Sequence, residues 1–211
     1  MKQKILSIYE RLYVHYGPQH WWPGDTPFEV VVGAILTQNT NWGNVERAIR
    51  NLKTAHALSA TALHTLPAAE LALLIMPVGY FNIKAKRLKN FIAFLVGEYK
   101  GSMKQMAKEP LPVIREKLLS VNGIGPETAD SILLYALDKQ TFVIDAYTKR
   151  VLSRHNMLDH EAPYDTFQKL FHDNLEADVQ LYNEYHALIV RLAKGHCRTR
   201  PLCPGCPLEG F

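Results

Sequence analysis

The chain of 211 residues is long enough for one large domain, or two small ones, with a buried core. Hydrophobic residues make up 47% of it and charged residues 21%, as in ordinary globular proteins. The net charge of +4 permits nucleic-acid binding without demanding it, and no apolar run approaches the ~20 residues that span a membrane. The start, MKQKILSIYERLY, lacks the apolar core of a signal peptide, so we expect a cytoplasmic protein with no membrane partner.

Three helices are predicted in the first quarter of the chain. Residues 3–16 alternate apolar and charged side chains with helical spacing. Thr26 and Glu29 form a capping box, which begins a nearly all-apolar, central helix at 28–36. The polar turn 37–40 leads into the third helix, and such a turn is normally only a connection.

Two adjacent tryptophans, Trp21 and Trp22, lie in a loop between the first two helices. Such rings are usually part of the core, and that alternative stays open. Two neighbouring residues cannot both continue one face of an amphipathic helix. We therefore expect at least one of the two rings to line a pocket.

The middle of the chain is predicted to be helical as well. Short helices begin near Ser59 and Pro67, a loop covers 77–82, and a longer helix covers 83–99. The longer helix is rich in Lys and Arg, of which we expect at least half to form a solvated face. Pro110 begins the next helix.

A tight turn at Val121-Asn122-Gly123-Ile124-Gly125 follows that helix, and Pro126 opens another, which ends near Leu137. Two glycines two residues apart let the backbone come close to a group outside the protein. The N–H groups of the turn and the new helix form an anion site suited to phosphate. By itself this pattern is weak, because a plain helix–helix turn can look the same.

A carboxylate follows the turn closely. The apolar run 142–144 ends in Asp145, which begins a helix to about Asn156. Lys149 and Arg150 come next, and a carboxylate between a phosphate site and basic residues indicates chemistry on a nucleic acid. Asp145 can also cap its helix, a role that is compatible with catalysis because a helix N-terminus keeps a carboxylate ionised.

The last two helices begin at Pro163 and Asp178, and all the cysteines follow them. Cys197, Cys203 and Cys206 are clustered as in a metal site more than as in a disulfide framework. No strand run, repeat or low-complexity tract interrupts the helices, so the chain is predicted to be all-α.

These segments resemble the helix-hairpin-helix and catalytic-aspartate motif of the endonuclease III (HhH-GPD) superfamily of DNA glycosylases. The matching residues are Val121 to Gly125, Thr128-Ala129 and Val143-Ile144-Asp145. Within the superfamily the chain is most similar to the monofunctional 3-methyladenine DNA glycosylases. They share the segments W-W-P, L-T-Q-N-T, G-x-x-N-x-K-A-K-R-L and G-I-G-x-E-[ST]-A-D.

The resemblance implies a two-lobed fold with the active site between the lobes. A six-helix lobe with the hairpin would cover 19–139, and a second lobe would combine 1–18 with 140–211. The implied activity is base excision repair: a monomer, in a bacterial or archaeal nucleoid, flips a damaged and alkylated base out of double-stranded DNA. Water then hydrolyses the N-glycosidic bond while Asp145 stabilises the sugar cation.

The resemblance also implies residues that bind DNA. Gln38 would fill the gap left by the flipped base, and Tyr80 would wedge into the helix opposite it. Gly123, Gly125 and Thr128 would bind DNA through the hairpin.

A base pocket and an ion site follow from the same resemblance. Trp21 and Trp22 would line the base pocket. The backbone carbonyls of Leu119, Val121 and Ile124 match those that hold a monovalent cation, K or Na, in related hairpins.

Glu127 departs from part of the superfamily. Bifunctional members carry a lysine here that forms a Schiff base with the sugar, which a carboxylate cannot do. Lys117, Lys139 and Lys149 lie elsewhere and are not obvious substitutes. We therefore expect a monofunctional enzyme.

The cysteine loop is a second departure. Cys197, Cys203 and Cys206 resemble the iron–sulfur loop of endonuclease III, but the matching fourth position lies one past Phe211. We expect a [4Fe–4S] cluster if the natural chain supplies a fourth cysteine. Zinc held by the three cysteines and His196 is the alternative.

Other functions stay open. One is an endonuclease III-like enzyme that acts on oxidised or mismatched pyrimidines with AP lyase activity. Another is a non-catalytic helix-hairpin-helix DNA-binding protein, against which Asp145 and the tryptophan pair argue. A purely structural helical protein would leave the glycine turn and the cysteine loop unexplained.

Overall fold

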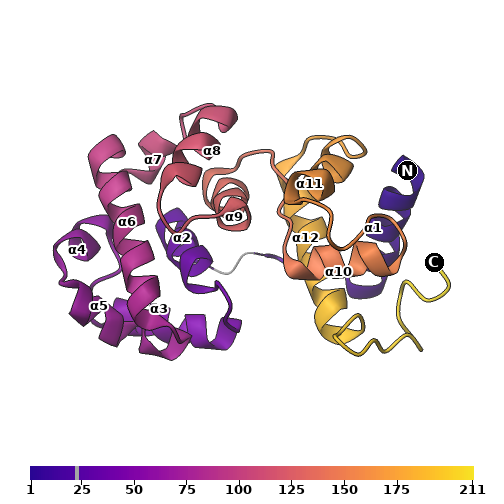
Figure 1. The fold of residues 1–211 in the computed structure, drawn as a ribbon, viewed down its shortest axis with the longest axis horizontal. Helices are drawn as coiled ribbons and strands as arrows, with labels where there is room; N and C mark the ends of the chain where they lie inside the picture. Colours follow the sequence, from indigo (N-terminus) through magenta and orange to yellow (C-terminus); the bar gives the residue numbers. More distant parts are fainter. Residues whose placement is uncertain (22–23) are drawn as a thin grey trace. The chain divides into compact units, whose positions relative to one another are not determined.

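The computed structural model describes residues 1–21 and 24–211, and none of these residues lies in a β-strand. The all-α prediction is therefore confirmed (Figure 1). The chain divides into two compact units: Met1–Trp22 with Gln140–Phe211, and Pro23–Lys139. Within the described residues, no helix is long and apolar enough to cross a membrane.

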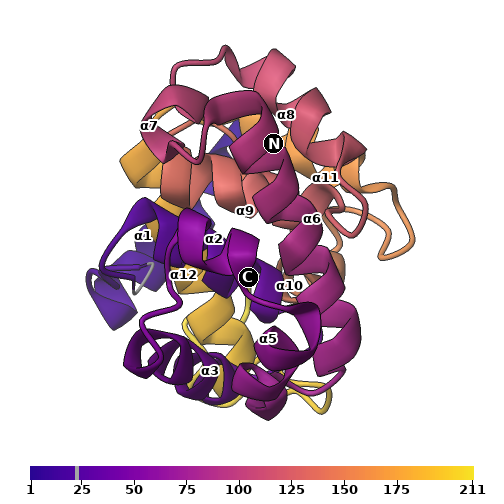
Figure 2. The same cartoon turned by 90° about the vertical axis from the view of Figure 1, so that its left-hand side faces the viewer.

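The unit Pro23–Lys139, here called the hairpin unit, is built around α2 and α6. Its elements are α2 (Pro27–Leu36), α3 (Trp42–Thr54), α4 (Ala60–Thr65), α5 (Ala68–Leu74), η1 (Met76–Val78), α6 (Phe81–Tyr99), α7 (Met103–Met106), α8 (Leu111–Ser120) and α9 (Pro126–Leu137). The apolar helix α2 is buried from Glu29 to its end and packs against α3, α6 and α9, as its sequence predicts. The helix α6 runs beside α2 and α5 (Figure 2), and it also packs against α4.

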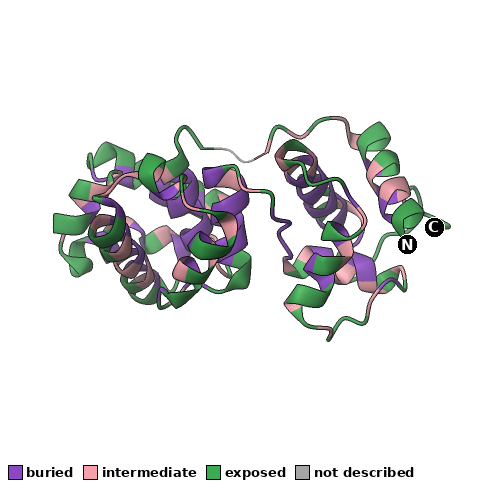
Figure 3. Cartoon of the chain, turned by 90° about the horizontal axis from the view of Figure 1, so that it is seen from above, coloured by how far each residue is buried: buried purple, intermediate pink, exposed green. Residues whose placement is uncertain are grey.

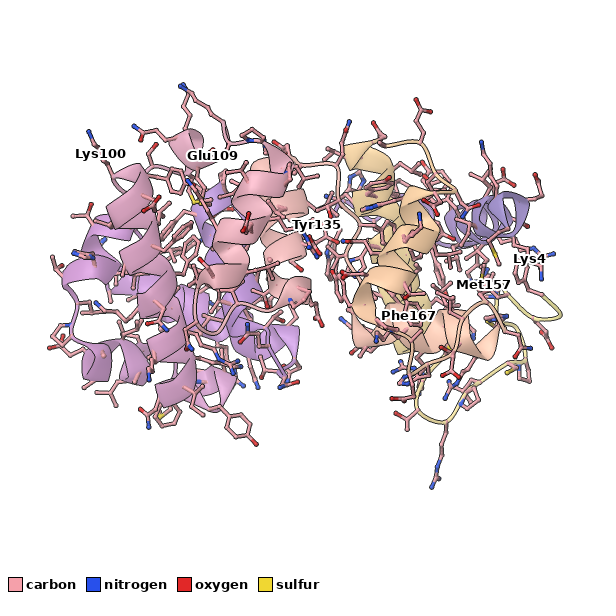
Figure 4. The ribbon with its side chains drawn as sticks, turned by 45° about the horizontal axis from the view of Figure 1, so that its top comes forward. Lys4, Lys100, Glu109, Tyr135, Met157 and Phe167 are labelled. Carbon is pink, nitrogen blue, oxygen red and sulfur yellow. The ribbon has the colours of Figure 1, made fainter. Side chains whose placement is uncertain are left out.

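The other unit, here called the aspartate unit, is built around α12 (Val179–Gly195). Its other helices are α1 (Lys2–Tyr16), α10 (Ala146–Arg154) and α11 (Tyr164–His172). Both α1 and α10 pack against α12. In Figure 3 the buried residues lie mainly on the inward faces of the helices of each unit. Phe167, labelled on α11 in Figure 4, is fully buried.

Residues 17–21, which follow α1, belong to the aspartate unit, whereas the lobe with the hairpin was predicted to begin at residue 19. The backbone N–H of Gln19 donates to Glu184 on α12 at 2.7 Å, and Arg191 donates to the Gln19 side chain at 2.9 Å. These two hydrogen bonds attach Gln19 to α12 and so move the boundary between the units. They could not be predicted, because Gln19 and α12 are far apart in sequence.

Most helix starts were predicted correctly from capping residues in the sequence. Thr26, Asn41 and Asp178 each accept a hydrogen bond from a backbone N–H of the helix that they begin. The region predicted as a loop at 77–82 differs: η1 covers its start, and α6 already begins at Phe81. The short helix α7 was not predicted.

Candidate active site and nucleic-acid interface

Asp145 is the N-cap of α10 and is largely buried, with 13% of its side chain exposed. Its Oδ1 accepts a hydrogen bond from the backbone N–H of Thr148 at 2.7 Å. Its Oδ2 lies 3.5 Å from Nε2 of His186, a buried residue of α12. The carboxylate is therefore held from two sides by one backbone donor and one imidazole.

This environment keeps Asp145 ionised. Burial by itself raises the pKa of the carboxyl group, but the charge of the nearby His186 and the hydrogen bond from Thr148 lower it by more. The pKa of Asp145 thus lies below its ordinary value. His186 was missed by the sequence analysis, because α12 is distant in sequence and a single histidine in an apolar helix has no distinctive spacing.

The extended segment before Asp145 is held by polar side chains from one face of α11. Ile144 N–H donates to the Tyr164 hydroxyl at 3.3 Å, and Phe142 N–H donates to Nε2 of His172 at 3.0 Å. Gln168 donates to the Phe142 carbonyl at 2.8 Å. These side chains replace the sheet partner that an extended segment normally requires. The three α11 residues recur at every fourth position, a signal that the sequence analysis did not use.

The hairpin turn joins α8 to α9, and its two glycines differ in backbone conformation and in the space around them. Gly123 has a φ of +97°, and a Cβ atom on it would meet Cγ of Arg87 at 2.3 Å. Gly125 has a φ of −95°, and a Cβ atom there would meet nothing within 4 Å. Gly123 is therefore required by the fold itself, whereas Gly125 opens onto free space in the part of the chain that the structure describes. Contact of either glycine with DNA stays a prediction.

Gln38 lies against this hairpin. Its Nε2 donates to the Gly123 carbonyl at 3.1 Å and to the Thr128 hydroxyl at 2.9 Å. Its Oε1 accepts a hydrogen bond from Arg87 of α6. The structure thus brings together three residues that the sequence analysis predicted as DNA-binding residues, and adds Arg87, which it missed.

Tyr80 is the most exposed aromatic side chain among the described large hydrophobic residues, with 74% of its surface accessible. Its φ of 44° lies in the left-handed region, directly after Gly79 with a φ of 64°. A non-glycine residue in this region is uncommon and marks a turn under strain. The ring therefore stands on a tight turn at the start of α6.

The ion predicted at the hairpin would use carbonyls of the same turn. The Val121 carbonyl accepts a hydrogen bond from Ile124 N–H at 3.0 Å, which closes the turn. Leu119, the third residue of this predicted set, lies partly exposed in the last turn of α8. The cation itself stays a prediction.

Glu127 is exposed in the first turn of α9. The lysines considered as substitutes have other partners. Lys117 donates to Glu109 at 3.0 Å, and this hydrogen bond, with a second to Tyr99, raises its pKa. Lys139 donates to a backbone carbonyl of the α7 region at 2.8 Å, and Lys149 donates to one before α11 at 2.9 Å.

Trp21 is half-buried and lines a hollow of about 420 Å³ against α12. The Lys194 ammonium group, which lines the same hollow, lies 5.8 Å from the Trp21 ring centroid and 6.0 Å from that of Tyr147. One face of Trp21 is therefore covered by a cation of the protein. Trp22, its predicted companion in the base pocket, lies outside the described residues.

The cysteine loop is attached to α10. Arg150 donates to the Cys197 carbonyl at 2.7 Å, and Arg154 donates to the Thr199 carbonyl at 2.9 Å. Cys197 is buried, whereas Cys203 is exposed and Cys206 is half-buried. In the described ranges, no group of three or more His, Cys, Asp or Glu side chains is arranged to hold a metal ion. The structure therefore does not show a metal site in this loop, and the [4Fe–4S] and zinc sites stay predictions.

Comparison with known proteins agrees with this geometry. Residues 32–177 match the model of the HhH-GPD superfamily base excision DNA repair proteins. The chain is 50% identical to a protein of Methanocaldococcus jannaschii that is provisionally named as a DNA repair glycosylase, over 99% of this chain and 96% of that protein.

Solved structures share the fold. One is the H. pylori 3-methyladenine DNA glycosylase bound to 1,N6-ethenoadenine, with a TM-score of 0.78 and 29% identity over 92% of this chain and 96% of that chain. Another is a trapped endonuclease III–DNA covalent intermediate, with a TM-score of 0.84 and 20% identity over 99% and 93% of the two chains. The all-α, helix-hairpin-helix glycosylase fold predicted from the sequence is confirmed. This chain belongs to the HhH-GPD superfamily and is a base excision repair DNA glycosylase.

Proposed function

We propose that this enzyme, acting as a monomer, removes an alkylated base, 3-methyladenine foremost, from double-stranded DNA. The observation that carries the proposal is Asp145, a largely buried carboxylate whose lowered pKa keeps it charged. The similarity to a 3-methyladenine DNA glycosylase supports the choice of base class.

The reaction breaks the bond between the sugar C1′ and the base nitrogen, and the electron pair leaves with the base. An oxocarbenium-like sugar develops, which a nearby carboxylate stabilises electrostatically. Water then adds to C1′ and loses a proton, for which Asp145 is the acceptor. The base must first leave the stack, because its glycosidic bond is inaccessible inside a duplex.

The nucleophile in this proposal is water and not a lysine. Glu127 stands where bifunctional relatives would carry the Schiff-base lysine. The partners of Lys117, Lys139 and Lys149 support the same conclusion, since each ammonium group is held in a hydrogen bond. The enzyme is therefore monofunctional in our proposal.

DNA binding is assigned to the hairpin unit. The open space at Gly125 lets a phosphate approach the N-terminus of α9, where the helix dipole favours an anion. Gln38 fills the gap left by the flipped base, and exposed Tyr80 wedges into the duplex opposite it. Gly123 and Thr128 hold Gln38 before DNA binds.

Base selection is assigned to Trp21 and Trp22. N-alkylation puts positive charge on the purine, and a cation over an indole ring gains roughly 0.5–2 kcal/mol. Lys194 already covers one face of Trp21, so the base uses the opposite face or the ring of Trp22. Alkylation also weakens the glycosidic bond, which makes strict selectivity by the pocket unnecessary.

In our proposal the cysteine loop binds a metal ion or cluster and takes no part in the reaction. Three thiolates and a fourth ligand would hold a [4Fe–4S] cluster, and His196 would complete a zinc site. Measured iron and zinc contents of anaerobically purified protein decide between them, and a metal-free folded protein would contradict both.

The experiment that tests the proposal measures which free base is released from methylated, uracil-containing and thymine-glycol duplexes under single-turnover conditions. We expect 3-methyladenine to be released fastest. Release of thymine glycol or uracil alone would favour an endonuclease III-like enzyme, and duplex binding without any release would favour a non-catalytic DNA-binding protein.

A further inference from the structure

Lys84 is a buried lysine of α6, with 2% of its surface exposed. Its Nζ donates to the Leu36 carbonyl at 2.8 Å and to the Val78 carbonyl at 3.0 Å. Burial, with a smaller effect from the charge of Arg87, lowers the pKa of Lys84 to about 8. A buried ammonium group is costly, so two well-formed hydrogen bonds are needed to keep it there.

The two carbonyls that Lys84 binds lie at corresponding places. Leu36 is the last residue of α2, and Val78 is the last residue of η1. Carbonyls at the ends of helices lack partners within the helix. Each of the two also lies two residues before a proposed DNA-inserting side chain, Gln38 in one case and Tyr80 in the other.

The backbone of Lys84 holds the Tyr80 turn as well. Its N–H donates to the Tyr80 carbonyl at 3.0 Å. The positive φ angles of Gly79 and Tyr80 need support from the surrounding structure. Lys84 thus binds this turn twice, through its side chain at Val78 and through its main chain at Tyr80.

Two further side chains on the same face of α6 bind neighbouring turns. Arg87 donates to the Gln38 side chain, and Asn90 donates to the Asn122 carbonyl of the hairpin turn at 2.9 Å. With Lys84 they are spaced three residues apart, which places them along one side of a helix. This face of α6 therefore connects all three turns that carry proposed DNA contacts.

We propose that Lys84 is a positioning residue that fixes Gln38 and Tyr80 relative to each other, so that both side chains enter the duplex in register. The inference rests on the proposed DNA roles of Gln38 and Tyr80. The bridge between the two carbonyls carries it, because a single ammonium group binds both the end of α2 and the end of η1.

The test uses a duplex with a tetrahydrofuran abasic site opposite 2-aminopurine, whose fluorescence changes when a wedge disturbs its stacking. Lys84→Met removes the donors and keeps the length of the side chain. We expect it to weaken binding roughly tenfold and to abolish most of the fluorescence change. Lys86→Met, at an exposed position of the same helix, is the matched control and should behave like the wild type.

A combined variant separates positioning from general damage. If Lys84 acts through the two inserting side chains, Lys84→Met should cause no further loss of affinity in a protein that already carries Gln38→Ala and Tyr80→Ala. A further roughly tenfold loss in that background, or an unchanged fluorescence signal in Lys84→Met alone, would overturn the inference.

Folding and the proposed function are controlled separately. Each variant is checked by thermal melting, and Lys84→Gln, measured at lower temperature, takes the place of Lys84→Met if the latter does not fold. Gln38→Ala and Tyr80→Ala are also measured singly. If neither changes binding or fluorescence, the proposed DNA roles fail together with the inference; if both do and Lys84→Met does not, the inference alone fails.

Discussion

Two helices, α11 in the aspartate unit and α6 in the hairpin unit, support functional segments in different ways. The helix α11 uses Tyr164, Gln168 and His172 to hold one extended segment. The helix α6 uses Lys84, Arg87 and Asn90 to hold three separate turns. The first arrangement fixes one residue, whereas the second fixes the spacing between several.

The difference matches what each region has to supply. Asp145 contributes a single charged group, whose position depends on the segment just before it. The hairpin unit contributes a phosphate site and two inserting side chains, which have to meet one duplex together. A change near Asp145 should therefore affect the chemical step, and a change along α6 should affect DNA binding.

Replacing Asp145 should have the largest effect on rate. In Asp145→Asn a neutral amide cannot offset the sugar cation, so we expect the single-turnover rate of base release to fall 10²-fold or more. Affinity for DNA should change little. Asp178→Asn is the matched control, because Asp178 also caps a helix through its carboxylate, with a bond of 2.6 Å. A near-native rate in Asp145→Asn would remove Asp145 from the mechanism.

The two glycines of the hairpin should separate folding from binding. Gly123→Val should lower the free energy of unfolding by about 1–3 kcal/mol or more, because of the positive φ and the clash with Arg87. Gly125→Val should leave stability nearly unchanged and weaken binding to all duplexes alike. Denaturant unfolding and salt-dependent binding measure the two effects. Equal effects of both substitutions on stability would contradict the distinction.

Replacing His186 should move the pH dependence of catalysis. Burial raises the pKa of Asp145 while His186 lowers it, so removal of the imidazole in His186→Phe leaves the effect of burial less opposed. The pKa should rise, and the acid limb of the rate profile should shift to higher pH. The control is His64→Phe at an exposed position. An unshifted acid limb would show that His186 only packs against the site.

The smallest expected signal concerns covalent chemistry. Borohydride added during turnover should trap no enzyme–DNA adduct, because Glu127 cannot form a Schiff base. Gel electrophoresis of the trapped products measures this, with Glu127→Lys as a second sample. Efficient trapping in the wild type would show that a lysine outside this position acts as nucleophile.

Features that depend on residues close together in sequence could be predicted without the structure. The caps at Thr26 and Asp145, the apolar helix α2 and the glycine turn follow from rules that operate over a few residues. Asp145 was found in this way, because a carboxylate at the end of an apolar run has a recognisable local pattern.

The basic residues of α6 show the limit of that approach. From the sequence, at least half of them were expected to form a solvated face. Instead, Lys84 binds carbonyls of two turns, Arg87 binds Gln38, and Lys89 donates to carbonyls at the end of α4, at 2.8 Å for Leu63. Only the packed structure distinguishes a lysine that binds protein from one that faces water.

The sequence by itself thus determined most of the helices, the hairpin and the carboxylate, because caps and hydrophobic periodicity depend on neighbours along the chain. The tertiary structure decided which partners surround them. It placed His186 beside Asp145 and Arg87 against Gly123, and it joined the turns before Gln38 and Tyr80 through one buried amine. These contacts link residues far apart in sequence, and they form only when helices pack, so no local pattern encodes them.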